Sequence, residues 1–181
     1  MTYVLLAVVA LFVLYAVYTY NRLIVLRNRI DNAWSQIDVQ LRRRYDLIAN
    51  LVETVKGYAA HERQVFQQVT EARARAIAAG SVGEQSQAEN VLTQALRSLF
   101  AVAENYPQLR ASETFQRLQE ELAGTESKIA FARQFYNDTV LRYENLRQSV
   151  PANLMAGALG FGRREYFEME EAAREPVRVQ F

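Results

Sequence analysis

The stretch IDNAWSQIDVQLRRRYDLIANLVETVKG, residues 30–57, decides the fold. Its apolar side chains recur at alternating steps of three and four, which places them on one face of a helix in coiled-coil-like spacing. That face consists of Ile30, Trp34, Ile37, Leu41, Tyr45, Ile48, Val52 and Val55. A helix with one long apolar face needs other helices to cover it, so we expect an all-α protein built as a helical bundle.

The same spacing continues in three later stretches. They are Val65, Val69, Ala72 and Ala76; then Leu92, Ala95, Leu96, Leu99, Ala103 and Tyr106; then Phe115, Leu118, Leu122, Thr125, Ile129, Ala132, Tyr136, Thr139, Tyr143, Leu146 and Val150. Gly80 and Gly83 indicate a turn, while Pro107 and Pro151 end the last two stretches because proline cannot continue the hydrogen-bond ladder. Trp34, Tyr45, Tyr58, Tyr136 and Tyr143 are expected in the core.

Gly57 leaves two architectures open. If the chain turns back between Gly57 and His61, four long helices form an antiparallel up-and-down bundle. If the helix continues through Gly57, only three helices result and the C-terminus points away from the membrane. We favour the four-helix arrangement because it returns the apolar residues after Val150 to the level of the lipid.

The residues before the bundle predict a membrane anchor. Residues 2–20, TYVLLAVVALFVLYAVYTY, carry no charged side chain, and about 20 apolar residues cross a hydrocarbon core of roughly 30 Å. Tyr15, Tyr18 and Tyr20 suit the lipid–water interface. No basic residue precedes the run, and AVYTY is a poor cleavage site, so we expect an uncleaved single-pass anchor over residues 1–21.

The arginines that follow the anchor predict its orientation. Arg22, Arg27 and Arg29 lie directly after the apolar run, and residues 42–44 add three more arginines. Basic flanks remain on the cytoplasmic side. We therefore expect the N-terminus outside and the bundle in the cytoplasm, at the cell (inner) membrane.

Composition excludes most chemical functions. The chain has 21 basic and 20 acidic residues, a net charge of +1, no cysteine and a single histidine, His61. This balance does not favour nucleic acid, and thiolate or cysteine-based metal chemistry is excluded. A metal site at His61 would need further ligands, and no Glu-x-x-His motif occurs. We assign no catalytic, cofactor-binding or metal-binding residue, no cofactor and no small-molecule substrate.

Polar residues near the apolar face have two possible uses. Arg44 neighbours the stripe and is expected to pair with an acidic group inside the bundle, whereas the rival interpretation is a surface for anionic lipid. Asn32, Gln36, Asn50, Asn137 and Asp138 lie next to apolar positions. They are expected to be buried and to cross between helices, and an exposed groove is the alternative. Solvated surface positions with i,i+4 pairs are expected for Glu113, Glu120, Glu121 and Glu126.

The bundle is expected over residues 22–150, and a C-terminal part over residues 151–181. This part begins with PANLMAGALGFG, residues 151–162, which is too short to cross a membrane. It either lies in the lipid interface or caps the end of the bundle. A charged tail and an extended stretch at residues 176–181 follow.

Four stretches resemble the LemA family. They are LRNRIDNAWSQIDVQLRRRYDLIANLVETVKGYAAHE (residues 26–62), VTEARA (69–74), ARQFYNDTV (132–140) and PANLMAGALGFGRREYFE (151–168). The resemblance implies one N-terminal transmembrane helix and an antiparallel helical bundle, and it brings no catalytic residues. We expect a non-enzymatic interaction or scaffold module with a protein partner or as a homo-oligomer. The alternative is a self-assembling protein that shapes the membrane, and an enzyme ranks last.

Overall fold

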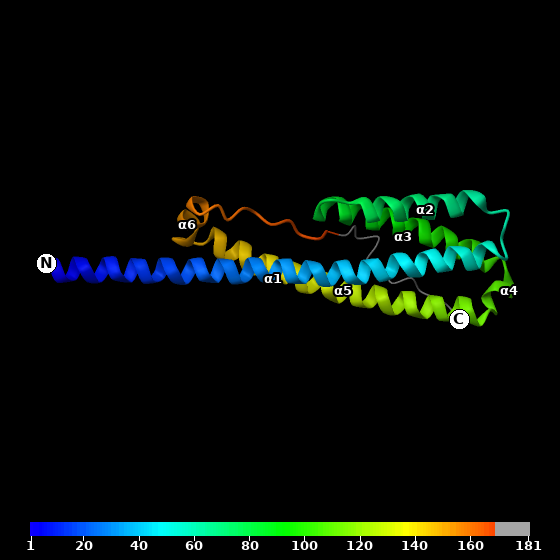
Figure 1. Cartoon of the computed structure of the whole chain (residues 1–181), viewed down its shortest axis with the longest axis horizontal. Coiled ribbons are helices and arrows are strands. Elements are labelled where there is room, and N and C mark those ends of the chain that lie inside the picture. The colour runs from blue at the N-terminus through cyan, green and yellow to red at the C-terminus, as the bar shows by residue number, and fades with distance from the viewer. Residues whose placement is uncertain (169–181) are drawn as a thin grey trace. The chain divides into compact units, whose positions relative to one another are not determined.

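The computed structural model describes residues 1–168. Its helices are α1 (Thr2–Lys56), α2 (Arg63–Ala78), α3 (Val82–Glu104), α4 (Pro107–Arg110), α5 (Glu113–Gln148) and α6 (Ala152–Ala158) (Figure 1). No strand occurs within these residues, so the all-α prediction is confirmed. The predicted extended stretch at residues 176–181 and most of the charged tail lie outside the described residues.

The turn predicted after Gly57 is confirmed, because α1 ends at Lys56 and α2 begins at Arg63. The amides of Tyr58 and Ala59 donate to the Val55 carbonyl at 3.0 and 2.9 Å and close the end of α1. Four long helices therefore follow one another in the chain. Their up-and-down order stays a prediction.

The turn before α3 is fixed by Ser81. Its hydroxyl accepts a hydrogen bond from the Glu84 amide at 3.2 Å, and the Glu84 carboxylate in turn accepts from the Gly80 amide at 2.9 Å. This reciprocal capping satisfies backbone donors that a helix start leaves unpaired. The prediction that Gly83 is a turn residue is wrong, because the cap at Ser81 starts the helix before it.

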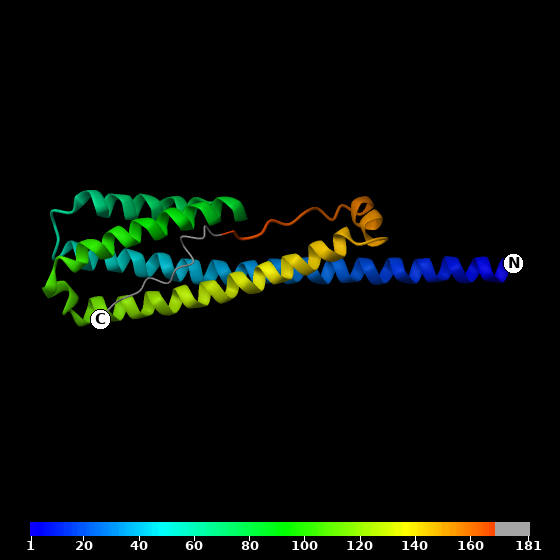
Figure 2. The same cartoon turned by 180° about the vertical axis from the view of Figure 1, so that it is seen from behind.

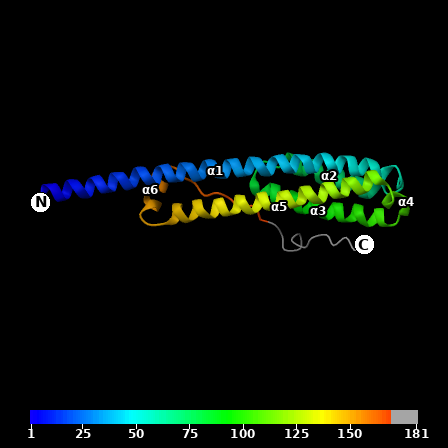
Figure 3. The same ribbon diagram turned by 90° about the horizontal axis from the view of Figure 1, so that it is seen from below.

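The described chain forms two compact units, the first built from Met1–Gln36 and Ala132–Tyr166, the second from Ile37–Phe131 with residues 167 and 168. In the first unit, the N-terminal part of α1 contains the one stretch of the described chain that is long and apolar enough to cross a membrane. Its large apolar side chains are exposed from Tyr3 to Leu14. Figure 3 shows α6 alongside α1 within this unit.

The second unit holds its core between four helices. Figure 2 shows α2 and α3 side by side in the view from behind. Buried apolar side chains come from each helix: Ile37, Leu41, Ile48 and Val55 from α1; Phe66 and Val69 from α2; Leu92, Leu96 and Leu99 from α3; Phe115, Leu122 and Ile129 from α5. Burial of these side chains stabilises the unit by roughly 25 cal/mol for each Å² of apolar surface that is removed from water.

Several predicted core positions need correction. Trp34 is only half-buried, and Tyr58 is exposed because α1 has already ended before it. The predicted burial is also wrong for the amides of Asn32, Gln36 and Asn50 and for the Asp138 carboxylate, which are exposed, whereas Asn137 is half-buried. One step along a helix rotates the side chain by about 100°, so the sequence neighbour of a buried residue points away from the core.

Replacing Gly124 by alanine is expected to stabilise the protein. Gly124 is exposed within α5, and a Cβ built on it meets no atom within 4 Å. The free energy of unfolding should rise by about 0.5–1 kcal/mol because alanine loses less backbone entropy in a helix. Gly160→Ala is the matched comparison, since φ is +73° there and a Cβ is strained. Thermal unfolding of the full chain in mild detergent measures both, and equal shifts would contradict the argument.

Candidate functional site

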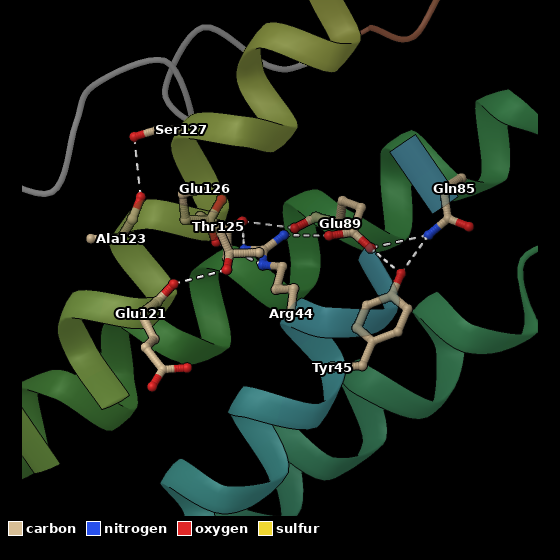
Figure 4. Close-up of polar contacts among 10 residues, drawn as sticks. Arg44, Tyr45, Gln85, Glu89, Glu121, Ala123, Thr125, Glu126 and Ser127 are labelled. Carbon is tan, nitrogen blue, oxygen red and sulfur yellow. Dashed lines mark hydrogen bonds and ion pairs between the residues drawn. The ribbon is translucent and has the colours of Figure 1, made fainter. Parts of the chain in front are cut away.

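The most strongly polar region of the second unit surrounds Arg44 of α1. This side chain is buried, with a residue exposure of 3%. Its Nη1 donates to Oε2 of Glu89, and its Nη2 donates to Oγ1 of Thr93 at 3.0 Å (Figure 4). Its Nε lies 2.7 Å from Oε1 of Glu126, which is the distance of an ion pair but without the geometry of a hydrogen bond. Arg44 thus joins α1 to carboxylates of both α3 and α5.

The second oxygen of Glu89 is also satisfied. Oε1 accepts hydrogen bonds from the Tyr45 hydroxyl and, at 3.0 Å, from Nε2 of Gln85. Gln85 also donates to the Ala76 carbonyl of α2 at 3.1 Å. Burial raises the pKa of Tyr45 far above its ordinary value, and the negative charge of Glu89 and their hydrogen bond raise it further. Tyr45 therefore keeps its proton and remains a donor to Glu89.

We call Arg44, Tyr45, Gln85, Glu89, Thr93 and Glu126 the buried network, after its four buried members; Thr93 and Glu126 are half-buried. All of its labelled members point toward one another in Figure 4. A buried ion pair is stabilising only if its remaining donors and acceptors are matched. Here hydrogen bonds from α1 and α3 match both oxygens of Glu89, while Nε of Arg44 has the ion pair with Glu126 and no hydrogen bond. The network can fix how the helices of the second unit are oriented, because its donors and acceptors bind one another across those helices.

The outcome for the predicted charges is mixed. Arg44 pairs inside the unit as expected, and the rival interpretation of Arg44 as a lipid-binding surface is wrong because the side chain is buried. Arg42 is exposed and pairs with Asp38 at 3.0 Å, while Arg43 lies 3.7 Å from the exposed Glu121. Glu126 is half-buried, with 38% of its side chain exposed, and its pairing with Arg44 of α1 was not predicted.

The sequence reasoning missed Glu89 and Gln85. A signal was present, because both fall on the apolar stripe of α3: Gln85, Glu89, Leu92, Leu96 and Leu99 are all buried. A glutamate at a position that the periodicity assigns to the core indicates a buried pair, since lone charges are rarely buried.

A second polar cluster lies in the first unit around Glu144 of α5, which is buried. One of its oxygens accepts from Nε and Nη2 of Arg147 at 3.0 and 2.7 Å and from Gln148 at 3.1 Å. The other accepts from the Arg164 backbone amide at 2.9 Å. Burial alone would raise the pKa of Glu144, but the bonds from Arg147, Arg164 and Gln148 together lower it.

Two tyrosines of α5 bind the same C-terminal segment. The Tyr143 hydroxyl donates to the Gly162 carbonyl, and the Tyr136 hydroxyl donates to the Glu165 carbonyl, both at 2.9 Å. Burial raises the pKa of Tyr136 to about 12 and also raises the pKa of Tyr143, so both keep their protons at neutral pH. Together with Glu144 they form what we call the α5 clamp, which holds residues 162–165 against the helix.

His61 does not lie in a cluster of possible metal ligands among the described residues. It is exposed in the turn between α1 and α2. Within residues 1–168, no group of three or more histidine, cysteine, aspartate or glutamate residues is placed to hold a metal ion.

Comparison with known proteins identifies the family of this chain. The family model for LemA matches residues 33–181, which is most of the chain. The chain belongs to the LemA family. The LemA match begins in α1 after the apolar run and includes both the buried network and the α5 clamp. The family membership that the sequence indicated is thus confirmed.

Among the LemA relatives are magnetosome proteins. Magnetosome protein MamQ 1 and MamQ 2 of Paramagnetospirillum magneticum are each 27% identical to this chain over 184 residues, covering 87% of it and 68% of their own length. Magnetosome protein MamQ of Magnetospirillum gryphiswaldense is 25% identical over the same shares. The apolar stretch of α1 is, by length and composition, a candidate membrane span within residues 1–168 of this LemA protein.

Proposed function

We propose that this protein is a non-enzymatic, membrane-anchored interaction module, whose helical bundle serves as a scaffold for a protein partner at the membrane surface. The observation that carries the proposal is the buried network. Its charges are matched by one another inside the second unit, so the network is suited to holding helices together. The magnetosome relatives support a role connected with membranes.

The proposal includes the location of the bundle in the cytoplasm, at the cell (inner) membrane. The basis is the exposed arginines Arg22, Arg27 and Arg29 that follow the apolar run of α1. Residues 1–21 serve as the anchor, residues 22–150 as the bundle, and residues 151–181 as the C-terminal part.

A membrane-impermeant maleimide tests this orientation, because the chain has no native cysteine. We expect a Gln68→Cys variant, with an exposed site on α2, to stay unlabelled in intact cells and to react once the membrane is opened. Thr2→Cys is the reciprocal control and should be labelled in intact cells. The opposite pattern at the two sites would place the bundle outside the cytoplasm.

Self-assembly that shapes the membrane is the second candidate function. It is favoured by two exposed aromatic side chains of α5: Phe131 of the second unit is 73% exposed, and Phe135 of the first unit is 53% exposed. Large aromatic side chains on a water-facing helix are typical of protein contacts. A second copy of the chain is one occupant that would bury them.

Site-specific photocrosslinking in native membranes distinguishes the two functions. We expect a photoreactive residue at Phe131 or Phe135 to give discrete adducts, and one at the exposed Gln94 of α3 to give none. An adduct with a different protein supports the scaffold, whereas an adduct with a second copy supports self-assembly. Equal and diffuse labelling at all three sites would count against both functions.

A further inference from the structure

The C-terminal part of the first unit packs against the end of the anchor. The ring of Phe161 meets the ring of Tyr20 edge-on, with centroids 5.8 Å apart and planes at 70°. The Arg27 guanidinium carbon lies 5.9 Å from the centroid of Phe161. Thr19 and Leu23 are fully buried on this stretch of α1, and Figure 3 shows α6 beside it.

The position of Tyr20 relates this contact to the bilayer. Tyr20 is the last residue of the apolar run, and a run of this length matches the hydrocarbon core at 1.5 Å per residue. The lipid–water boundary must therefore lie close to Tyr20 when α1 spans the membrane. Any segment in contact with Tyr20 lies at the same depth.

The large side chains that this segment turns outward are apolar, and Asn153 is an exposed polar residue among them, with its Oδ1 accepting from the Leu154 amide at 2.8 Å. Val150 is 80% exposed, Leu154 73% and Leu159 51%. No charged residue occurs between Gln148 and Arg163. Exposed apolar residues without a charge among them suit the boundary between headgroups and acyl chains, and are costly in water.

Charges resume on the side of the segment that is away from the apolar run. Arg27 and Arg29 are exposed on α1, and Arg163 is exposed after α6, while Arg164 pairs with Asp31 at 3.3 Å. Arginines at this level can bind lipid phosphates. The unit thus changes from apolar to basic in the same order as a bilayer changes from acyl chain to headgroup.

We infer that residues 150–159 make a second, shallow contact with the membrane, in which Val150, Leu154 and Leu159 insert at the boundary of headgroups and acyl chains. The inference rests on the anchor of the proposed function but does not depend on its scaffold role. Of the two interpretations that the sequence left open for residues 151–162, this one assigns them to lipid.

Fluorescence depth measurement on the full chain tests the contact. The protein is reconstituted into vesicles of phosphatidylcholine with phosphatidylglycerol, and an environment-sensitive dye is attached at Leu154→Cys or, separately, at Leu159→Cys. Both side chains are exposed, so the substitutions leave the core unchanged. Val9→Cys within the span and Gln68→Cys on α2 are the membrane and water controls.

We expect the dye at both test sites to emit to the blue of the Gln68 control and to be quenched more by a nitroxide near the headgroup than by one near the acyl terminus. Val9 should show the reverse preference. Water-like emission at both test sites, with Val9 still quenched, would overturn the shallow contact but leave the anchor intact. Blue emission without quenching by either nitroxide would overturn it in favour of a second protein copy. A Val9 dye that is not quenched would refute the anchor itself.

Discussion

Replacing Arg44 by methionine is expected to lower the free energy of unfolding by about 3 kcal/mol. Removing one partner of a buried ion pair leaves an uncompensated charge, which costs about 3–5 kcal/mol. The lower end applies here because Glu89 keeps its hydrogen bonds from Tyr45 and Gln85. For a chain of this size the midpoint of thermal unfolding should fall by roughly 6–12 °C, which circular dichroism in mild detergent measures.

Two further variants make the Arg44 result specific. Arg42→Met removes a neighbouring arginine that is exposed and pairs only with Asp38 along the helix. Its effect should stay within about 0.5 kcal/mol. Adding Glu89→Gln to Arg44→Met removes the unpaired charge and should restore part of the stability. If Arg44→Met unfolds like Arg42→Met, the buried network does not stabilise the second unit.

Replacing Glu144 by alanine is expected to release residues 162–165 from α5. The change removes the acceptor of the Arg164 amide and of the Arg147 and Gln148 side chains. Hydrogen bonds to a charged group contribute about 1.5–3 kcal/mol each to stability. Hydrogen exchange at the Arg164 amide should therefore speed up by at least about tenfold, since about 1.4 kcal/mol is a factor of ten. Mass spectrometry of the peptide that contains residues 161–168 measures it.

Glu53→Ala is the matched control for Glu144→Ala. Glu53 makes a similar i,i+3 ion pair, with Lys56 at 2.8 Å, but on the exposed surface of α1. Its removal should leave exchange at Arg164 unchanged. Equal exchange in both variants would show that the α5 clamp does not hold the segment.

The lowered pKa of Glu144 also predicts a pH dependence. Because the carboxylate is favoured in the folded state, its stabilising effect is present above the ordinary value of 4.5 and is lost as the pH falls through the lower folded pKa. The difference in stability between wild type and Glu144→Ala should therefore be constant near neutral pH. This difference in stability should narrow as the pH falls below about 4.5. A difference that widens instead would contradict a charged Glu144 carboxylate in the folded state.

The apolar periodicity was sufficient to predict the helices because it is a local property. The stripe from Ile30 to Val55 is buried in the structure apart from Trp34, and α1, α3 and α5 end close to Gly57, Pro107 and Pro151. These signals act within a few residues, through side-chain spacing and backbone restrictions. They say little about which helix covers which face.

The partners of the buried network could not be predicted in the same way. Arg44 was expected to find an acid, but Glu89 lies 45 residues away along the chain and its choice depends on helix packing. The wrong prediction of buried amides has a different cause. Asn32 and Asn50 are next to apolar residues in the sequence, but the rotation of the helix directs their side chains to solvent. The α5 clamp was not predicted at all, since its three side chains bind main-chain atoms, which leave no trace in residue identity.

That last property has a consequence for how the C-terminal segment can evolve. Tyr136, Tyr143 and Glu144 recognise two carbonyls and one amide, groups that almost every amino acid presents identically. The two sides of this contact therefore differ in how many substitutions they tolerate. The three α5 side chains can be replaced by few residues. At the main-chain positions that they bind, only proline at residue 164 would remove a required donor. New side chains can thus be introduced at Gly162, where a Cβ would meet no atom within 4 Å, without changing the path along α5, whereas the Arg164 side chain is also held by its ion pair with Asp31.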